Sequence, residues 1–188
     1  MSRPWSSANP LPGGRKDWEQ LSRTTAYEAY GRAVVDVTYR LPSGKVDTFS
    51  VREDAPSVAV LALTEAGEAL VTHQFRPGPG QFVYELPGGY LNAGETPLVA
   101  AGRELLEETG YGGDLEMVGH CFGDSYSSSV KFCVVGRHCR RRRPPQPDDT
   151  EYIEVMHVSP GELRRLLRTG DVTDVDLAYL GLDALGLL

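Results

Sequence analysis

Residues 89–111 read GYLNAGETPLVAAGRELLEETGY, a glycine-containing loop that leads into a helix. Thr96 suits the N-cap of this helix, because its side-chain oxygen can accept a backbone hydrogen bond. Pro97 suits the first helical position, where no N–H is needed, and Gly110 suits the left-handed stop. The stretch therefore predicts one helix over residues 97–109.

Three carboxylates gather on one face of this helix. Residues three and four apart lie one above the other, so Glu104, Glu107 and Glu108 are neighbours. The apolar residues form a separate side that we expect to face the core: Leu98, Val99, Leu105 and Leu106. Because like charges repel, the acidic face favours a bound hard cation, Mg²⁺ or Mn²⁺, which prefers carboxylate oxygens as ligands.

An alternative interpretation is that these glutamates form an ordinary solvated face, which is common for charged helices. The complete spacing decides against it. The segment resembles the Nudix box, GX5EX7REUXEEXGU with U apolar, at every specified position: Gly89, Glu95, Arg103, Glu104, Leu105, Glu107, Glu108, Gly110 and Tyr111.

The resemblance implies both a fold and a reaction. Nudix hydrolases belong to the α/β class and form an α/β/α sandwich with a mixed β-sheet, to which this chain would add a short N-terminal β segment. Their reaction is attack by a metal-activated water on a phosphorus atom of a nucleoside diphosphate joined to a second group. We therefore expect Mg²⁺-dependent hydrolysis, with Mn²⁺ as the other metal, to a nucleoside monophosphate and a sugar phosphate.

The resemblance also implies a metal site built from the box glutamates. Glu104 and Glu108 are similar in position to the principal ligands, and Glu107 would assist as a ligand and in catalysis. The carbonyl of Gly88 would add a further ligand, because glycine lets the backbone approach closely.

Other charged residues receive supporting or catalytic roles by the same resemblance. Arg103 would hold the carboxylate four residues later, and Glu95 would steady the helix region rather than act as a nucleophile. Many relatives take their catalytic base from an acidic loop before a late strand, and residues 148–151 (DDTE) resemble that loop. Asp149 and Glu151 are the candidate bases, of which we favour Glu151; the alternative is a solvated acidic turn.

The residues before the box narrow the range of possible substrates. Residues 74–77 (QFRP) and 84–89 (YELPGG) resemble the (Q)(Y/F)R…ELPAG pattern of the ADP-ribose and nucleotide-sugar pyrophosphatase branch. In that branch the arginine contacts substrate phosphate, so Arg76 is the candidate here; the alternative is a surface arginine at a strand end. Gly89 and Tyr90 are further candidates for substrate contacts.

Residues 122–129 (FGDSYSSS) lack the Ser-Pro-Gly turn that ADP-ribose enzymes typically carry after the box. Tyr126 stands approximately in its place, and a tyrosine there marks dinucleoside polyphosphate hydrolases; alternatively it is a packing residue. The departure leaves nucleotide sugars and dinucleoside polyphosphates open as substrates beside ADP-ribose. A non-catalytic nucleotide-sensing module is another alternative, which the intact box disfavours.

The bulk properties exclude several classes of protein. The chain has 188 residues, a net charge of −7 and three cysteines without CxxC spacing. These values disfavour a nucleic-acid partner, a disulfide framework and a structural zinc site. With no apolar leader and no run long enough to span a bilayer, we expect a cytoplasmic protein without membrane contact. The arginine run at 140–143 is interpreted as a solvated loop or as an attraction for anionic substrate.

Three regions are expected along the chain. Residues 1–17 are rich in Pro, Gly and Ser and predict a flexible arm. Residues 18–56 have the pattern of the N-terminal β segment that builds a homodimer in the branch that the chain resembles. Residues 57–188 would form the Nudix domain.

Within these regions, strands and two further helices are expected. The apolar run at 57–63 (SVAVLAL) is typical of a buried central strand. Strands at 27–39 and 48–52 would precede it in the N-terminal segment. The last helices are expected at 161–169 and 174–185.

Overall fold

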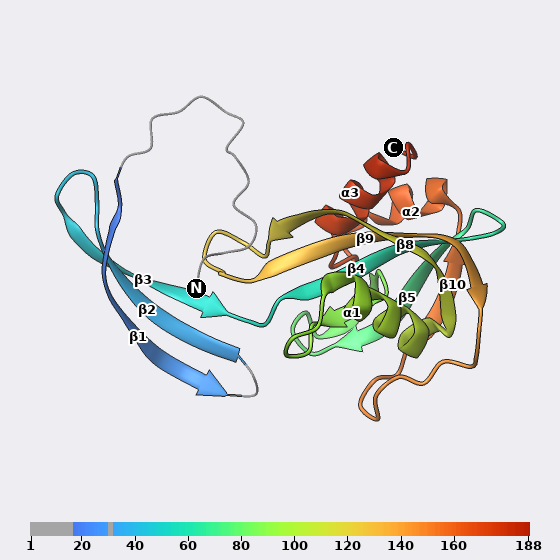
Figure 1. The fold of residues 1–188 in the computed structure, drawn as a ribbon, viewed down its shortest axis with the longest axis horizontal. Coiled ribbons are helices and arrows are strands. Elements are labelled where there is room, and N and C mark those ends of the chain that lie inside the picture. Colours follow the sequence, from blue (N-terminus) through green and yellow to red (C-terminus); the bar gives the residue numbers. More distant parts are fainter. Residues whose placement is uncertain (1–16, 30–31) are drawn as a thin grey trace.

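The computed structural model describes residues 17–29 and 32–188. The flexible arm expected at residues 1–17 therefore lies, apart from Asp17, outside the described residues. The described chain forms a three-stranded sheet followed by a larger layered body (Figure 1).

Seven strands form the sheet of the body. They are β4 (Ser57–Thr64), β5 (Ala69–Arg76), β6 (Gln81–Glu85), β7 (Gly88–Tyr90), β8 (Tyr111–Phe122), β9 (Val130–Arg141) and β10 (Glu154–Val158). The order is β10-β5-β4-β9-β8, with β6 paired to β5 and β7 paired to β4. β4 and β9 run parallel, whereas the other pairs are antiparallel, so the predicted mixed sheet is confirmed.

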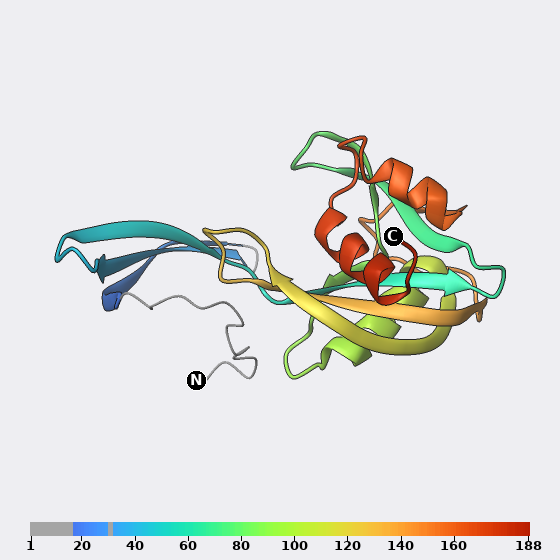
Figure 2. The same cartoon turned by 90° about the horizontal axis from the view of Figure 1, so that it is seen from above.

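Helices cover both faces of this sheet. Helix α1 (Pro97–Glu104) lies on one face, and α2 (Pro160–Leu166) and α3 (Val175–Ala184) lie on the other (Figures 1 and 2). Side chains of β4 alternate between the two faces. Val60 packs into the core beneath α1, whereas Leu61 packs with α2 and α3, and both are fully buried. The α/β/α sandwich and its buried central strand are therefore confirmed.

The N-terminal segment forms its own antiparallel sheet from β1 (Glu19–Ala29), β2 (Arg32–Arg40) and β3 (Val46–Glu53). This sheet projects from the body (Figures 1 and 2). The single strand expected at 27–39 is wrong, because the chain reverses between β1 and β2. Strand-forming residues lie on both sides of that reversal, so composition and alternation did not reveal it.

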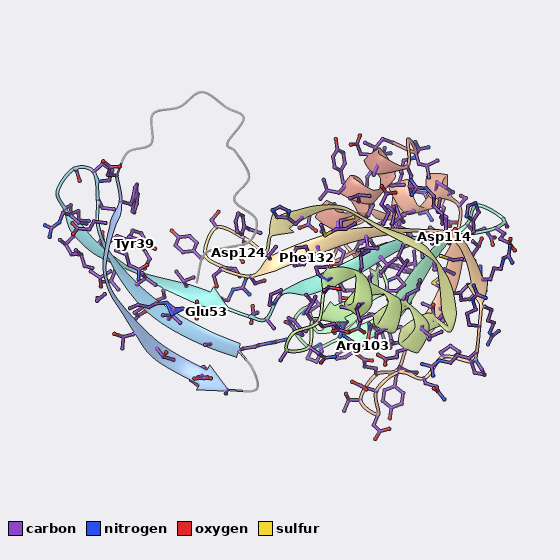
Figure 3. All side chains as sticks on the ribbon, in the orientation of Figure 1. Tyr39, Glu53, Arg103, Asp114, Asp124 and Phe132 are labelled. Atoms are coloured by element: carbon purple, nitrogen blue, oxygen red, sulfur yellow. The ribbon has the colours of Figure 1, made fainter. Side chains whose placement is uncertain are left out.

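The loop between β8 and β9 ties this sheet to the body. The Arg52 N–H donates to the Tyr126 carbonyl at 2.8 Å, and the Ser128 N–H donates to the Arg52 carbonyl at 3.0 Å. The Arg52 guanidinium also pairs with Asp124, which lies beside β3 in Figure 3. These contacts lie near the end of β3, whereas β1 is exposed along almost its whole length.

The helical segment over residues 97–109, which contains α1, begins and stops as its sequence predicts. Thr96 caps it by accepting a hydrogen bond from the Val99 N–H at 3.4 Å, and Gly110 adopts a positive φ of 77° after its end. The regular α-helix ends at Glu104, and a π-helical turn, η1 (Leu105–Thr109), completes the segment. Such turns are rare and often occur at functional sites.

The core-facing side expected for this helix is partly wrong. Leu105 is fully buried, but Leu98 and Val99 are 43% and 60% exposed. Ala100 and Ala101 face the core instead. Small side chains at these two positions let the helix lie close to the sheet, and the larger residues of the first turn then point outward.

The two later helices are confirmed as α2 and α3, although α2 ends at Leu166, earlier than expected. Among the described residues, no helix combines the length and the apolar character needed to cross a membrane.

Gly181 lies where α3 packs on β4. A Cβ at this position would lie 2.8 Å from Cδ2 of Leu61 and 2.9 Å from its Cβ. We expect Gly181→Ala to lower the free energy of unfolding by about 1–3 kcal/mol, because the core must shift to accept the added methyl group. Urea unfolding followed by circular dichroism measures the change.

Gly161→Ala in α2 is the matched control, since its new Cβ would meet no atom closer than 3.9 Å. This variant should be neutral or stabilising, because alanine restricts the unfolded chain more than glycine does. Equal destabilisation by both substitutions would contradict the packing argument.

Candidate active site

Strand β7 holds the start of the glycine loop against the central sheet. Gly88 pairs with Ala59 of β4, and Gly89 pairs with Val58. A Cβ at Gly88 would lie 2.8 Å from Cα of Ala59, so a larger residue could not keep this pairing.

The next glycine lies directly against a glutamate of the helix. A Cβ at Gly89 would lie 2.7 Å from Cδ of Glu104, far inside normal contact distance. The missing side chain therefore leaves room for a carboxylate beside the loop backbone. The glycine loop and the helix therefore lie in direct contact where Gly89 meets Glu104.

Arg103 joins this loop to the helix (Figure 3). Its Nη1 donates to Glu104 at 2.7 Å and to Glu107 at 3.2 Å. Its Nε and Nη2 donate to the two oxygens of Glu95 at 3.0 and 2.9 Å, and Nη2 also reaches the Tyr90 carbonyl at 3.1 Å. These charge-assisted bonds lower the pKa of Glu95 to about 2, so its carboxylate stays ionised.

Glu108 is buried beside this network. The residue is 2% exposed, and its Oε2 accepts a hydrogen bond from the Gly88 N–H at 3.0 Å. Burial raises the pKa of Glu108 well above its ordinary value, and the charges of Glu104 and Glu151 raise it further. Arg76 lowers this pKa, but its effect is smaller. Burial also raises the pKa of Glu104.

The oxygen atoms that Glu104, Glu108 and the glycine loop offer are suitable ligands for a divalent cation. Added positive charge would offset the burial of Glu104 and Glu108, and the Gly88 backbone already contacts Glu108. The described part of the chain contains no group of three or more His, Cys, Asp or Glu side chains arranged to hold a metal. Mg²⁺ does not require one, because it usually takes one or two carboxylates and completes its shell with waters and substrate phosphates.

A cavity of about 320 Å³, here called the acidic cavity, opens beside these groups. It gathers most of the site residues that the sequence predicts: Arg76, Gly88, Gly89, Tyr90, Arg103, Glu104, Glu107 and Glu151. Asp148 of the predicted acidic loop also lines it, as does Asn92, which no motif had indicated.

The acidic loop before β10 reaches this cavity through a tight turn. The Glu151 N–H donates to the Asp148 carbonyl at 2.9 Å, and both residues line the cavity, whereas Asp149 does not. The Gln146 N–H donates to the Glu107 carbonyl at 2.7 Å and so ties the loop to the helix.

The arginine run at 140–143 does not line the acidic cavity. The N–H groups of Arg142 and Arg143 donate to the Gly110 carbonyl at 2.7 and 3.2 Å, and Arg140 pairs with Glu65 at 2.5 Å. The backbone of the run therefore holds the C-terminal end of the helical segment.

A second cavity, of about 440 Å³, adjoins the first through Arg76 and the glycine loop. Arg32, Glu85 and Asp174 line it, and none of them is a site residue predicted from the sequence. Arg32 comes from β2 and Asp174 from the start of α3, so no local motif could have placed them here. Glu85 belongs to the YELPGG segment, and this motif is the one feature of the sequence from which a role for Glu85 could have been predicted.

Glu85 fixes the position of Arg76. This residue is 8% exposed, and its carboxylate accepts hydrogen bonds from Gln74 Nε2 at 2.8 Å and Arg76 Nε at 2.7 Å. Thr173 Oγ1 adds a third bond at 2.8 Å. The guanidinium is therefore held where the two cavities meet.

Asp174 shares a lysine with a second aspartate. Lys131 Nζ lies 3.7 Å from Asp174 Oδ1 and 2.8 Å from Asp176 Oδ1. Burial raises the pKa of Asp174 to about 6. Burial also acts on Asp176, but hydrogen bonds from Lys131 and Cys121 outweigh it and hold the pKa of Asp176 below its ordinary value.

Tyr126 is not brought together with the other predicted site residues. It lies in the loop between β8 and β9, is 58% exposed, and lines neither of these cavities.

Comparison with known proteins gives the same family that the Nudix box indicates. The model of the NUDIX domain matches residues 53–176. The chain is 29% identical over 142 residues to the ADP-ribose pyrophosphatase of Bacillus subtilis, covering 74% of this chain and 77% of that protein. It is 32% identical over 155 residues to the ADP-sugar pyrophosphatase of Mus musculus, covering 78% and 69%.

A solved structure shows the same fold. The crystal structure of an ADP compounds hydrolase superposes with a TM-score of 0.78, covering 94% of this chain and all of that one. At 19% identity, the likeness concerns the fold alone.

Asp174 and Asp176 should respond oppositely to pH, because their pKa values shift in opposite directions. A carboxyl with a raised folded pKa destabilises the fold as pH rises from its unfolded value, 3.8, to about 6. A carboxyl with a lowered folded pKa contributes stability that is lost as pH falls. Between roughly pH 4 and 7, Asp174→Asn should therefore gain in Tm relative to the parent protein.

Asp176→Asn should instead lose Tm relative to the parent as pH rises toward about 5, and then level off. Calorimetry of the three proteins from about pH 3 to about pH 7 measures both slopes. Parallel slopes for the two variants would contradict the assignment of the shifts.

Proposed function

The chain belongs to the Nudix family, and on this premise we propose that it hydrolyses the pyrophosphate bond of a nucleoside diphosphate derivative, such as ADP-ribose or a nucleotide sugar. The products would be a nucleoside monophosphate and a sugar phosphate. One observation carries the proposal: the buried carboxylate of Glu108 and the half-buried carboxylate of Glu104 lie beside the glycine loop, where Arg76 and Glu151 line the same cavity as Glu104.

The relatives support this choice of substrate. Two of them are an ADP-ribose pyrophosphatase and an ADP-sugar pyrophosphatase, and each match covers about three quarters of this chain. The intact set of box glutamates favours hydrolysis over a non-catalytic sensing role.

Glu104, Glu108 and the carbonyl of Gly88 would hold a divalent cation, with Glu107 assisting. Such an ion, Mg²⁺ or Mn²⁺, neutralises charge on the phosphates and lowers the pKa of water. Arg103 keeps Glu104 and Glu107 in place through its bonds at 2.7 and 3.2 Å.

Glu151 is the candidate base that the geometry favours. It lines the acidic cavity, and its charge acts on both Glu104 and Glu108. Asp149 remains a candidate by sequence, but it does not line the cavity. Glu151 would accept a proton from the attacking water.

Arg76 would bind the substrate's phosphates. It lines both cavities and is oriented by the buried Glu85. Gly89 and Tyr90 line the same two cavities and would contact the substrate on either side of the diphosphate. Tyr126, the remaining candidate for a substrate contact, lines neither of the two cavities.

Residues 18–56 would form the dimerising segment, and residues 57–188 the hydrolase domain. The N-terminal sheet exposes β1 along almost its whole length and carries a cluster of Trp18, Tyr39 and Phe49 with ring centroids 5.8–6.2 Å apart. Trp18 is 53% exposed. Exposed aromatic surface on a small sheet favours a protein partner, here a second copy.

A substrate panel with Mg²⁺ tests the proposed activity. It contains ADP-ribose, UDP- and GDP-sugars and nucleoside triphosphates, and coupled phosphatase detects the released monophosphates. We expect turnover of ADP-ribose or a nucleotide sugar. Turnover of triphosphates alone would contradict the proposal.

Glu108→Gln should lower kcat in this assay by at least about a hundredfold, because a neutral amide is a poor ligand for a cation that stabilises the transition state. Circular dichroism should show an unchanged fold. Glu162→Gln, on the exposed side of α2, is the control and should retain parental kcat. Full Mg²⁺-dependent activity of Glu108→Gln would refute the ligand assignment.

Removal of residues 1–56 should convert a dimer into a monomer, since the proposed interface is then missing. Sedimentation velocity measures the mass. Removal of residues 1–16 alone is the control and should leave the dimer intact. A dimer that persists without residues 1–56, or a monomeric full-length chain, would refute the assignment.

A further inference from the structure

The segment between α2 and α3 lies against β6. The Tyr84 N–H donates to the Asp171 carbonyl at 2.8 Å, and the Thr173 N–H donates to the Tyr84 carbonyl at 3.3 Å. Val172 forms a parallel bridge with Tyr84 between these two bonds. We call residues 171–174 the α2–α3 linker, which runs beside β6 like a further short strand.

The α2–α3 linker brings one hydroxyl to the carboxylate that holds Arg76. Gln74 Nε2 and Arg76 Nε both donate to Oε2 of Glu85, at 2.8 and 2.7 Å. Oε1 of the same carboxylate accepts a hydrogen bond from Thr173 Oγ1 at 2.8 Å. The two oxygens of Glu85 therefore have different partners, and the partner of Oε1 comes from a segment distant in the sequence.

This hydroxyl bond fixes the rotation of the Glu85 carboxylate. Glu85 is 8% exposed, so its oxygens depend on partners within the protein. The last torsion of a glutamate side chain is broad, and without Thr173 the carboxylate is free to turn about it. Oε2 would then leave the line of the Arg76 Nε–H, and a hydrogen bond weakens steeply as its angle closes. The direction of the guanidinium therefore depends on Thr173.

A cluster of charged and polar side chains holds the linker in place. Lys131 Nζ lies 3.7 Å from Asp174 Oδ1 and 2.8 Å from Asp176 Oδ1. Cys121 Sγ also donates to Asp176, at 3.1 Å. Lys131 belongs to β9 and Cys121 to β8, so these contacts bind the start of α3 to two strands of the sheet. Thr173 is exposed, but the backbone that carries it is anchored on both sides.

We propose that Thr173 is a positioning residue, which acts through Glu85 to hold Arg76 in the direction needed to bind the diphosphate. The inference rests on the proposed function, which gives Arg76 a phosphate as its ligand. A guanidinium is planar and pairs best with a phosphate when two N–H groups face two oxygens. Its affinity for the substrate therefore depends on its orientation as well as on its charge.

The Nε–H of Arg76 gives a test that does not depend on activity. In ¹H–¹⁵N spectra this signal, identified by its loss in Arg76→Lys, should exchange slowly with water, because a buried carboxylate holds the proton. Thr173→Val keeps the shape of the side chain and removes the hydroxyl. It should raise the exchange rate by about tenfold, the size expected for the loss of one hydrogen bond. Thr173→Ser keeps the hydroxyl and should restore the parental rate.

A double-mutant cycle shows whether Thr173 affects the substrate through Arg76. With Mg²⁺ and the substrate that the parent protein cleaves fastest, Thr173→Val should raise KM by about tenfold and change kcat by less than about threefold, because Arg76 holds the substrate before and during the reaction. In an Arg76→Ala background the same substitution should have no further effect, since the residue through which it acts is missing.

Thr64→Val is the matched control. The Thr64 hydroxyl accepts a hydrogen bond from the Glu68 N–H at 3.2 Å within a turn, and the residue lines neither of the two cavities that Arg76 joins. This variant should keep the parental KM and the parental exchange rate.

Two results would overturn the inference: an unchanged exchange rate of the Arg76 Nε–H in Thr173→Val, or an equal rise in KM with and without Arg76. A parent protein that cleaves no compound of the substrate panel would instead refute the proposed function. The exchange rate would still decide the role of Thr173 in that case, because slow exchange that is lost in Thr173→Val and regained in Thr173→Ser supports it.

Discussion

One guanidinium holds the candidate active site together. Arg103 bonds the carboxylates of Glu95, Glu104 and Glu107, and through Glu95 and the Tyr90 carbonyl it fastens the glycine loop to the helix. Without the positive charge of Arg103, these three neighbouring carboxylates would repel one another. The loop that follows β7 is held to the helix by that single side chain, whereas the pairing of β7 with β4 holds Gly88 and Gly89 in place.

The same arrangement leaves charge that the protein does not neutralise. Burial raises the pKa of Glu104 and Glu108, and Glu151 adds a further negative charge to the same region. A chain selected only for stability would not keep ionisable groups under these conditions. Their presence is understandable if a divalent cation completes the site, since its charge favours the ionised form of each ligand.

Local features of the fold could be predicted, whereas contacts between distant segments could not. Thr96, Pro97 and Gly110 marked the helix because capping depends on a few adjacent residues. The positions of Arg32 and Asp174 in the second cavity could not be predicted, because the fold brings them there from opposite ends of the chain. The prediction that Leu98 and Val99 face the core was wrong, because periodicity alone does not reveal how closely a helix approaches its sheet.

The most direct test of the account is the location of a bound metal. Crystals soaked in Mn²⁺ and measured near the manganese absorption edge reveal the ion by anomalous scattering. We expect a peak between the carboxylates of Glu104 and Glu108 and the carbonyl of Gly88. A peak confined to other residues, in a protein whose hydrolysis of ADP-ribose or a nucleotide sugar requires Mn²⁺, would contradict it.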